Sequence, residues 1–582
     1  MNKRLYSVRP INDLKDMLAQ SVSLFGNRTA YKIKTENGDY QEITYSAFNK
    51  DITAFGTSLL DFELQGKSIA IFGENRYEWC VAYLSIVNGV GTAVPIDKEL
   101  TASEIQNLLE QSKVSAVVFT GKYLDAVEEM RPQIPFVKHW ICMDDVSEES
   151  EIHSFSNLMS HGQKMVDEGN QEFEKIEINP DSPLILLFTS GTMGFAKGVM
   201  LSHKNICAVI TGVCATVNVR PEDRLLSILP LHHTYECTLG FLTIIYSGAS
   251  ISFSDGLRYI SQNLNEYKPT ILVTVPLLLE NVYNKVWKKA NKQKSMKRSL
   301  IVGQVISGFL YKVLGIDIRR KLFAQIHDNV GGELRMFITG AAAIDPEVSK
   351  GFHKWGFSVL QGYGLTECAP LVTGNRDFIY RDKSAGLAIP GVEVKINSPD
   401  KKGIGEILIK GLNVMQGYFN DPEETERVLV DGWFYSGDVG RIDRKGFLYI
   451  TGRCKNVIVT KNGKNIFPEE LESYIKDSPY VGECIVYGEL DKTSGETHII
   501  AQIFPDIEVI REKLKNINLN IDTEEIRNLI QDVIKNVNRK IPLYKHIRQV
   551  TIRDKEFEKT TTRKIKRHTQ IPMPMQMKNN TV

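Results

Sequence analysis

The stretch KSIAIFGENRYEWCVAYLSIVNGVGTAVPID, residues 67–97, predicts the class of the fold. Its first part, KSIAIFG, is an apolar run that ends in glycine, which is typical of a buried strand. The part YEWCVAYLSIVNGV has the length and apolar face of a helix, and GTAVPID is a second strand-like run. A strand, a helix and a strand in this order indicate a parallel sheet covered by helices.

The alternation continues along the chain. TASEIQNLLEQS (101–112) is a predicted helix with Thr101 at its N-cap, and VSAVVFTG (114–121) is a third predicted strand. Three later runs have the same character, namely PTILVTVP (269–276), LRMFITG (334–340) and FSVLQGYG (357–364). Each of them ends in a glycine or proline turn, where α/β sheets place their ligands. We therefore predict an α/β protein with its site at these strand ends.

Composition limits the class of protein. The chain has 582 residues, 42% of them hydrophobic and 24% charged, which predicts a soluble globular protein of two or more domains. A net charge of +1 gives no argument for nucleic-acid binding. The eight cysteines contain no C-x-x-C pair, which favours a reducing cytosol over a zinc site or a disulfide framework.

No apolar run reaches the roughly 18 residues of a membrane span. We predict a cytoplasmic protein, with peripheral attachment to the inner membrane face as an open alternative.

The sequence pattern changes near Ile404, where short strand-like runs replace the earlier alternation of strands and helices. After Gly452 comes a compact charged segment with a predicted helix at TEEIRNLIQDVIKNVN (523–538). This pattern indicates a separate small α+β domain. We predict a large domain at 1–452, a small domain at 453–567, and a disordered tail at 568–582.

The segment 281–330 is unusually basic. Between Lys285 and Arg298 lie seven basic residues and no acidic one, followed by the amphipathic run IVGQVISGFLYKVLGI (301–316). One interpretation is a solvated helix whose apolar face is covered by the rest of the protein. The other is a surface that approaches anionic lipid.

LLFTSGTMGFAKGVMLSHKN (186–205) is the first candidate site. An apolar run breaks into hydroxyls and glycines, passes Lys197, and then becomes helix-like. Hydroxyl and backbone donors on a flexible loop, together with one cation, suit a polyphosphate. The P-loop pattern G-x-x-x-x-G-K-[ST] does not fit, because Gly198 follows the lysine. The loop is therefore expected to hold phosphates by a different scheme.

QGYGLTECAP (361–370) is the second candidate site. Glycines on both sides of Tyr363 permit a close backbone approach, and the ring between them offers a flat face. Glu367, next to the hydroxyl of Thr366, can hold Mg²⁺ beside a phosphate. The alternative is an ordinary strand-to-loop turn with a buried tyrosine.

Two further motifs are weak by themselves. PLHHTYE (230–236) has adjacent histidines, but neighbours in sequence rarely bind one metal and no third ligand is suitably spaced, so a hydrogen-bonded histidine is favoured. YSGDVG (435–440) contains Asp438 in a glycine turn, for which an Asx-turn is the simpler interpretation.

The order of the motifs is more informative than any one of them. LLFTSGTMGFAKG, PLHHTYE, ITGAAAI, YGLTE, YSGDVG, GRCK and EKTTTRKIKR together resemble the AMP-forming acyl-activating superfamily, to which acyl-CoA synthetases, adenylation domains and beetle luciferases belong. The resemblance covers about residues 20–567. It implies a large domain of parallel sheets with a distorted β-barrel subdomain, and a small mobile lid domain. It also implies ATP, Mg²⁺ and coenzyme A as cofactors and substrates.

The resemblance implies a role for each matching residue. The phosphate loop around the β- and γ-phosphates of ATP would be formed by Thr189, Ser190, Gly191, Thr192 and Lys197. The adenine and acyl side would be formed by Gly340, Ala341, Ala342, Tyr363, Gly364 and His233. The residues closest to the reaction would be Thr366 at the α-phosphate, Glu367 as the Mg²⁺ ligand and Lys564 as the late catalytic lysine. The remaining roles are Asp438 and Arg453 at the ribose and Lys455 as the hinge.

The sequence departs from the family pattern at two places. Met193 replaces a threonine of the phosphate loop, and Phe195-Ala196 stands where x-Pro is common. Arg563 occupies a common glycine position before Lys564. Met193 removes one possible phosphate donor, so we expect somewhat weaker ATP positioning. Neither change removes a charged or Mg²⁺-binding group, so we do not expect loss of activity.

The acyl substrate is constrained only weakly. The apolar run TYECTLGFLTIIYSGAS (234–250) could line a tunnel, and the 281–330 segment and TKNGKNIFPEELE (460–472) resemble long-chain synthetases. We therefore expect a medium- to long-chain fatty acid with coenzyme A as the thiol. One alternative is a ligase that loads an acyl carrier protein, and another is an inactive nucleotide-binding regulator.

Overall fold

The computed structural model describes residues 5–35, 37–147, 151–189, 196–459, 465–490, 497–514, 521, 523–559 and 565–570. The chain forms two compact units. The first contains residues 1–394, 409–434 and 446–448, and the second contains residues 395–408, 435–445 and 449–582.

One sheet of the first unit contains both strands of the stretch 67–97. Its spatial order is β19-β9-β8-β4-β3-β5-β6-β7. The bounds are β3 (Lys67–Phe72), β4 (Gly91–Pro95), β5 (Ala116–Phe119), β6 (His139–Cys142), β7 (His153–Ser154), β8 (Pro183–Thr189), β9 (Lys197–Ser202) and β19 (Gly417–Tyr418). The strands from β8 to β7 pair in parallel, whereas β9 is antiparallel to β8 and β19. The predicted α/β alternation is therefore confirmed.

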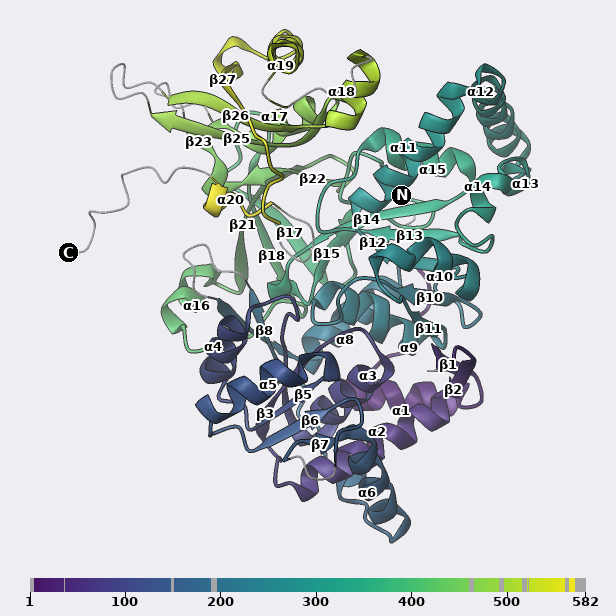
Figure 1. The fold of residues 1–582 in the computed structure, drawn as a ribbon, viewed down its shortest axis with the longest axis vertical. Helices are drawn as coiled ribbons and strands as arrows, with labels where there is room; N and C mark the ends of the chain where they lie inside the picture. The colour runs from purple at the N-terminus through teal and green to yellow at the C-terminus, as the bar shows by residue number, and fades with distance from the viewer. Residues whose placement is uncertain are drawn as a thin grey trace, which may run out of the picture. The chain divides into compact units, whose positions relative to one another are not determined.

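Helices cover this sheet as the sequence pattern predicts. Helix α4 (Ala102–Ser112) begins at Thr101, whose side chain accepts from the backbone of Glu104 while the Glu104 carboxylate accepts from Thr101 N–H. Its apolar residues pack with those of α5 (Leu124–Met130) onto β3, β5 and β6 (Figure 1). The predicted helix after β3 is α3 (Tyr77–Ser85), continued by a π-turn to Val90. Gly91 then lies so close to β3 that a Cβ would stand 2.0 Å from the Lys67 carbonyl oxygen.

The other large sheet of this unit has the order β16-β15-β14-β13-β12-β10-β11-β1-β2. The bounds are β1 (Thr29–Lys34), β2 (Tyr40–Thr44), β10 (Arg224–Ser227), β11 (Ser250–Phe253), β12 (Ile271–Thr274), β13 (Met336–Thr339), β14 (Ser358–Gly364), β15 (Leu371–Gly374) and β16 (Leu387–Ala388). Its strands run parallel from β1 to β14. Helices α10 (Ile260–Tyr267), α11 (Pro276–Lys292) and α15 (Pro346–Trp355) contribute to the apolar core on this sheet.

The remaining helices of the first unit lie around these sheets. Their bounds are α1 (Leu14–Phe25), α2 (Tyr45–Asp61), α6 (Phe155–Asp167), α7 (Glu172–Lys175), α8 (His203–Cys214), α9 (Thr243–Ser247), α12 (Lys294–Phe309), α13 (Arg319–Leu322), α14 (Ala324–Asp328) and α16 (Pro422–Val428). Among the residues described, no helix is both long and apolar enough to cross a membrane.

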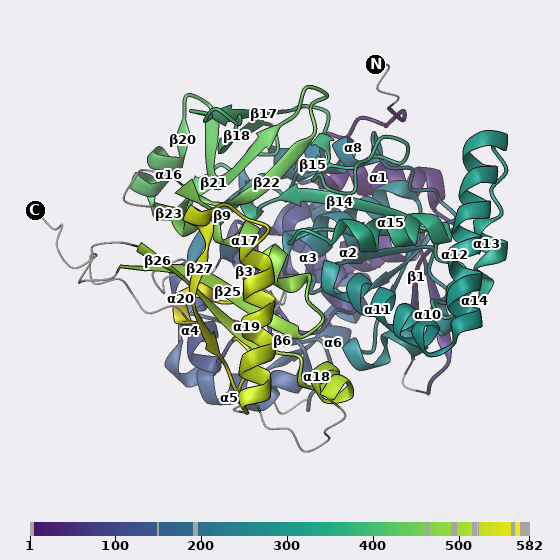
Figure 2. The same ribbon diagram turned by 90° about the horizontal axis from the view of Figure 1, so that it is seen from above.

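Apart from β19, the strands described between Val392 and Arg453 form a further sheet in the order β17-β18-β21-β20, with β22 beside β21. The bounds are β17 (Val392–Asn397), β18 (Gly405–Gly411), β20 (Leu429–Val430), β21 (Trp433–Ile442) and β22 (Leu448–Arg453). The C-terminal part of the second unit is α+β, as predicted. Strands β25 (Val481–Leu490), β26 (Thr497–Pro505) and β27 (Ile547–Ile552) share an apolar core with α17 (Pro468–Lys476), α18 (Ile507–Leu514) and α19 (Glu524–Asn538) (Figure 2). Residues 571–582 of the predicted tail lie outside the described part, and α20 (Arg567–Gln570) precedes them.

Candidate active site

The predicted phosphate loop is the connection of a β-hairpin. Strand β8 ends at Thr189 and β9 begins at Lys197, and these two residues are register partners. The Thr189 hydroxyl lies 3.4 Å from the Lys197 carbonyl oxygen. Ser190, Gly191 and Thr192 lie outside the described residues. The helix expected after the lysine is α8, which begins at His203, but strand β9 lies between them, because GVMLS pairs with β8.

Lys197 is held by an acidic and an aromatic side chain. Its Nζ contacts the Glu424 carboxylate and lies 5.1 Å from the centre of the Tyr418 ring. Glu424 lies on α16 (Pro422–Val428), which begins at the N-cap Asp421. The hydrogen bonds from Arg427 and then the contact with Lys197 lower the pKa of Glu424 to about 2. The Lys197 cation therefore has a permanently charged partner.

The same tyrosine reaches the predicted magnesium ligand. Tyr418 donates its hydroxyl to Glu367 Oε1 at 3.0 Å, and the Glu367 carbonyl accepts from Met415 N–H at 2.8 Å. We call Lys197, Glu367, Tyr418 and Glu424 the phosphate-side cluster. It brings together one cation and two carboxylates, of which Glu424 pairs with the cation and Glu367 is oriented by Tyr418. A cation and an oriented carboxylate are groups that can hold a metal-bound polyphosphate. An oriented oxygen ligand of this kind fits Mg²⁺.

The backbone before Glu367 is as crowded as the sequence predicts. A Cβ on Gly364 would stand 1.7 Å from the Pro370 carbonyl oxygen, so only glycine fits at that position. Tyr363 pairs with Thr373 on the antiparallel strand β15. Thr366 and Glu367 follow on a short 3₁₀ turn, Thr366–Cys368. The close approach of β15 therefore fixes the positions of Thr366 and Glu367 after the end of β14.

The segment after β13 forms a wall against Tyr235. Gly340 is buried, and a Cβ there would stand 3.3 Å from the Tyr235 ring. Ala341 has a φ of 67°, and both Ala341 and Ala342 are exposed. The Tyr235 hydroxyl lies 3.1 Å from the carbonyl oxygens of Thr274 and Ile338, at the ends of β12 and β13. These contacts hold the π-helix η4 (Tyr235–Leu242) against the strand ends.

His233 lies in the turn that leads into η4, and its neighbour His232 is buried. The rings of the two histidines are 4.2 Å apart. The sequence shows no third ligand at a suitable spacing, but the fold brings one candidate beside the two histidines. Asp97, which follows β4, brings its Oδ1 to 3.5 Å from His232 Nε2. One donor atom from each of the three residues lies within 4.8 Å of the other two. Asp97 could not be found from the sequence, because it is 135 positions away from His232 and the two residues follow strands of different sheets.

A hydrogen-bonded network holds the histidine turn in place. Asn75 donates to Ser227 Oγ at 2.9 Å and to the Leu229 carbonyl at 2.6 Å, and it accepts from Leu231 N–H. Ser227 in turn donates to Glu236 Oε1 at 2.6 Å. Burial raises the pKa of the Glu236 carboxyl to about 8, so this side chain is mostly neutral at pH 7.

We expect Glu236→Gln to flatten the dependence of stability on pH. The folded-state pKa of about 8 exceeds the usual 4.5, so between these values the unfolded chain binds fewer protons than the folded chain. The stability of the unaltered protein should therefore fall as pH rises through this window, by about 1.4 kcal/mol per pH unit at most. The amide cannot ionise, so the fall in Tm from pH 5 to pH 8 should be smaller in the variant. Exposed Glu128→Gln is the control, and equal falls in both variants would contradict this role.

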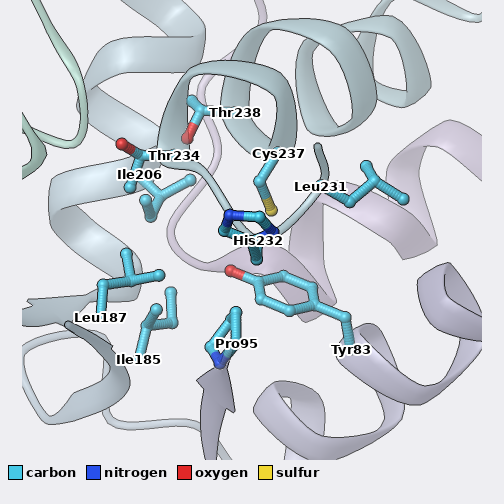
Figure 3. A pocket seen from close by; sticks show the side chains of 10 residues that line it. All are labelled: Tyr83, Pro95, Ile185, Leu187, Ile206, Leu231, His232, Thr234, Cys237 and Thr238. Atoms are coloured by element: carbon cyan, nitrogen blue, oxygen red, sulfur yellow. The ribbon is translucent and has the colours of Figure 1, made fainter. Parts of the chain in front are cut away.

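The apolar run after His233 is mostly buried and contributes Thr234, Cys237 and Thr238 to the lining of a small cavity. The cavity is lined by Tyr83, Pro95, Ile185, Leu187, Ile206, Leu231, His232, Thr234, Cys237 and Thr238 (Figure 3). Its volume of about 10 Å³ corresponds to roughly one water molecule. An acyl chain therefore enters here only if these side chains repack.

Two of the predicted residues meet in the second unit. Arg453 Nε lies 3.0 Å from Asp438 Oδ1, and Asp438 is buried whereas Arg453 is exposed. The turn before Asp438 is fixed because Ser436 donates to the Ile407 carbonyl and Gly437 N–H donates to Glu406. The predicted hinge, Lys455, is exposed on a 3₁₀ turn, Cys454–Asn456. Lys564 lies outside the described residues.

Tyr418 and Glu424 are the other site residues that the sequence motifs did not reveal. Both belong to GYFNDPEET (417–425), in which Asp421 and Pro422 are a strong helix-start signal. That signal predicts α16, but nothing in the sequence shows that the strand β19 before it pairs with the phosphate hairpin.

The chain is similar to known proteins along most of its length. A family profile described as AMP-binding enzyme matches residues 18–419, and one described as AMP-binding enzyme C-terminal domain matches residues 455–572. Long-chain-fatty-acid–CoA ligase 5 of Rattus norvegicus is 30% identical over 90% of this chain and 79% of its own. Fatty acyl-CoA synthetase B of Dictyostelium discoideum is 26% identical over 96% of this chain and 88% of its own.

Solved structures share the fold. The anthranilate CoA ligase AuaEII in complex with anthranoyl-AMP aligns with a TM-score of 0.75 at 20% identity, over 96% of both chains. ATP-bound MatB from Rhodopseudomonas palustris aligns with a TM-score of 0.71 at 22% identity, over 96% of this chain and 98% of its own.

Proposed function

Since this chain belongs to the family of AMP-binding enzymes, we propose that it is an acid–thiol ligase that forms AMP. It activates a medium- to long-chain fatty acid with ATP and transfers the acyl group to coenzyme A. The family membership and the names of the relatives support the reaction. The phosphate-side cluster is the structural observation that carries the proposal, because it places a cation and an oriented carboxylate beside one hairpin.

The first half-reaction makes the acid reactive. A carboxylate oxygen attacks the α-phosphorus of ATP, so that a carboxyl–phosphate bond forms, the bond to the β-phosphate oxygen breaks, and pyrophosphate leaves. Lys197 binds the leaving phosphates, and Glu367 would hold Mg²⁺, whose charge neutralises the phosphate oxygens. Thr189, Ser190, Gly191 and Thr192 surround the β- and γ-phosphates, and Thr366 contacts the α-phosphate. Lys564 bridges the carboxylate and the α-phosphate.

The remaining residues position the two substrates. Tyr363 and Gly364 hold the adenine, and Gly340, Ala341 and Ala342 separate it from the acyl carboxylate, which lies beside His233. Asp438 accepts the ribose hydroxyls with help from Arg453. In the second half-reaction the coenzyme A thiol attacks the acyl carbon and AMP leaves. We propose that the domain 453–567 turns about Lys455 between the two steps, which removes Lys564 and admits the thiol.

Two alternatives make different predictions. A ligase that loads an acyl carrier protein transfers the acyl group to holo-carrier and not to free coenzyme A, which mass spectrometry distinguishes. An inactive nucleotide-binding regulator shows no ATP–pyrophosphate exchange with any acid. The decisive experiment is therefore exchange across a panel of fatty, aryl and amino acids. We expect the highest rate with medium- to long-chain fatty acids, and silence across the whole panel would refute the ligase.

We also propose that α12 attaches the enzyme peripherally to an anionic membrane. The interpretation of a covered apolar face is wrong, because only Leu300, Gly303 and Ser307 of α12 are buried. The exposed large apolar side chains of this region are Ile301, Val302, Val305, Ile306, Phe309, Tyr311, Val313, Leu314 and Ile316. Val305 is 68% exposed and Phe309 is 60% exposed. In both views α12 projects from the sheet that contains β12–β14 (Figures 1 and 2). Apolar anchors beside seven basic residues suit an anionic lipid surface.

Neutralising Lys288, Lys289 and Lys292 to glutamine should weaken vesicle binding. Each basic residue near an anionic surface contributes about 1 kcal/mol, so the triple variant should bind about a hundredfold more weakly. Co-sedimentation with vesicles that contain phosphatidylserine measures the change. Lys401→Gln with Lys402→Gln, which neutralises two lysines in an exposed turn elsewhere, is the control. If binding survives the triple change, the segment is not the anchor.

A further inference from the structure

Asp97, His232 and His233 form a cluster of metal-binding side chains that the proposed reaction does not use as a metal site. One donor atom from each residue lies within 4.8 Å of the other two. We propose that these three residues bind one divalent transition-metal ion, with zinc as the fitting case. This site is separate from Glu367, which holds Mg²⁺ in the proposed function.

The distance between Asp97 and His232 favours a shared ion over a direct hydrogen bond. Asp97 Oδ1 and His232 Nε2 are 3.5 Å apart, beyond the 2.7–3.2 Å usual for N–H···O hydrogen bonds. Two ligands about 2.1 Å from a tetrahedral zinc ion are about 3.4 Å apart. His232 Nε2 is also buried with no hydrogen-bond partner in the described part of the chain. A metal ion between the two atoms would give this nitrogen a bond in place of the hydrogen bond that it lacks.

The protein holds both sides of the cluster in place. Glu99 N–H donates to Asp97 Oδ1 at 2.9 Å and thereby orients the carboxylate. On the other side, Asn75 fixes the turn before the histidines through Leu229 and Leu231. Backbone bonds from His233 N–H to the Pro230 carbonyl and from Cys237 N–H to the His233 carbonyl close the turn. Contacts of this kind keep metal-binding residues in position, so the binding of an ion would require only rotation of the three side chains.

The chemistry of the donors selects the ion. Two imidazoles and one carboxylate are typical of zinc and of other first-row transition metals, whereas Mg²⁺ and Ca²⁺ prefer oxygen ligands alone. Three protein ligands leave a fourth position open, as in zinc sites that exchange a ligand. A bound metal ion would occupy a ring nitrogen of His233. Because this side chain lies beside the acyl carboxylate in the proposed function, the ion should also slow acyl-AMP formation. That second effect rests on the proposed function, whereas metal binding itself does not.

Cobalt substitution tests the site directly. Co²⁺ is titrated into the nucleotide-free, full-length protein carrying Cys454→Ser, because Cys454 is the exposed cysteine and could bind metal by itself. We expect visible absorption that saturates at one equivalent and is displaced by Zn²⁺. Asp97→Asn and, separately, His232→Gln should each weaken Co²⁺ binding at least about tenfold in that background. Unchanged Tm values show that each variant folds.

The outcomes separate this proposal from the ligase assignment. X-ray absorption of the cobalt-loaded protein, which needs no further variant, should show two imidazole ligands. Saturable binding lost in both variants supports the site even if no acid is activated. No uptake, uptake unchanged by both substitutions, or a cobalt spectrum without imidazole overturns it, whatever the ligase assay gives.

Discussion

Lys564→Ala should lower the rate of acyl-AMP formation by about three orders of magnitude. Removing one preorganised group from a developing charge typically costs 10²–10³-fold, and this lysine is proposed to bridge both reacting groups. Thioester formation from supplied acyl-AMP should change little, because the lysine is proposed to leave the site before the thiol attacks. The two half-reactions are measured separately, by pyrophosphate release and by coenzyme A consumption.

The control for this experiment is Lys566→Ala, which removes the same charge two positions further along the same segment. It should leave both half-reactions within a few-fold of the unaltered enzyme. Equal losses of both half-reactions in Lys564→Ala would show that the lysine serves the whole cycle, and the proposed division of labour would be refuted.

Glu367→Gln should reduce pyrophosphate release by about 10²–10³-fold and raise the Mg²⁺ concentration needed for half-maximal rate. The amide keeps the shape and can still accept from Tyr418, but it loses the charge that a hard cation requires. Magnesium titration at saturating ATP separates the loss of the ligand from a general loss of activity. An unchanged magnesium dependence would exclude Glu367 as the ligand.

Tyr418→Phe is the matched comparison for Glu367→Gln. It removes only the hydroxyl that orients the carboxylate, so the loss should be about ten- to a hundredfold and in the same magnesium-dependent direction. A Tyr418→Phe variant with ordinary magnesium dependence and lowered Tm would mean that the hydroxyl is structural.

The fold was predictable because its signals are local. About ten residues of sequence are enough to predict each of three elements: the strand from Lys67 to Phe72, the capped helix after Thr101 and the strand that ends at Gly364. The strand at β9 was missed because GVMLS is short, and its identity depends on pairing with β8. Local propensity cannot reveal such a partner.

The candidate site was predictable only in part, for the same physical reason. Motif residues such as Glu367 and Asp438 lie in or next to glycine-containing turns, which can be recognised from the sequence. Tyr418, Glu424 and Asp97 have no such local mark, and they acquire a role only through chain segments that pack beside them. The exposure of α12 was likewise undecidable, because an amphipathic pattern does not say whether another element covers its apolar face.

The ion pair between Lys197 and Glu424 means that any anion reaching this lysine competes with a carboxylate already in place. In the proposed function, where Lys197 binds the phosphates of ATP, nucleotide binding is an exchange of counter-ions, and the measured affinity is the difference in free energy between the two ion pairings. The exchange also runs backwards. When the pyrophosphate leaves, Glu424 can pair with Lys197 again. Release of the product therefore does not leave the Lys197 cation without a counter-ion at a position shielded from water.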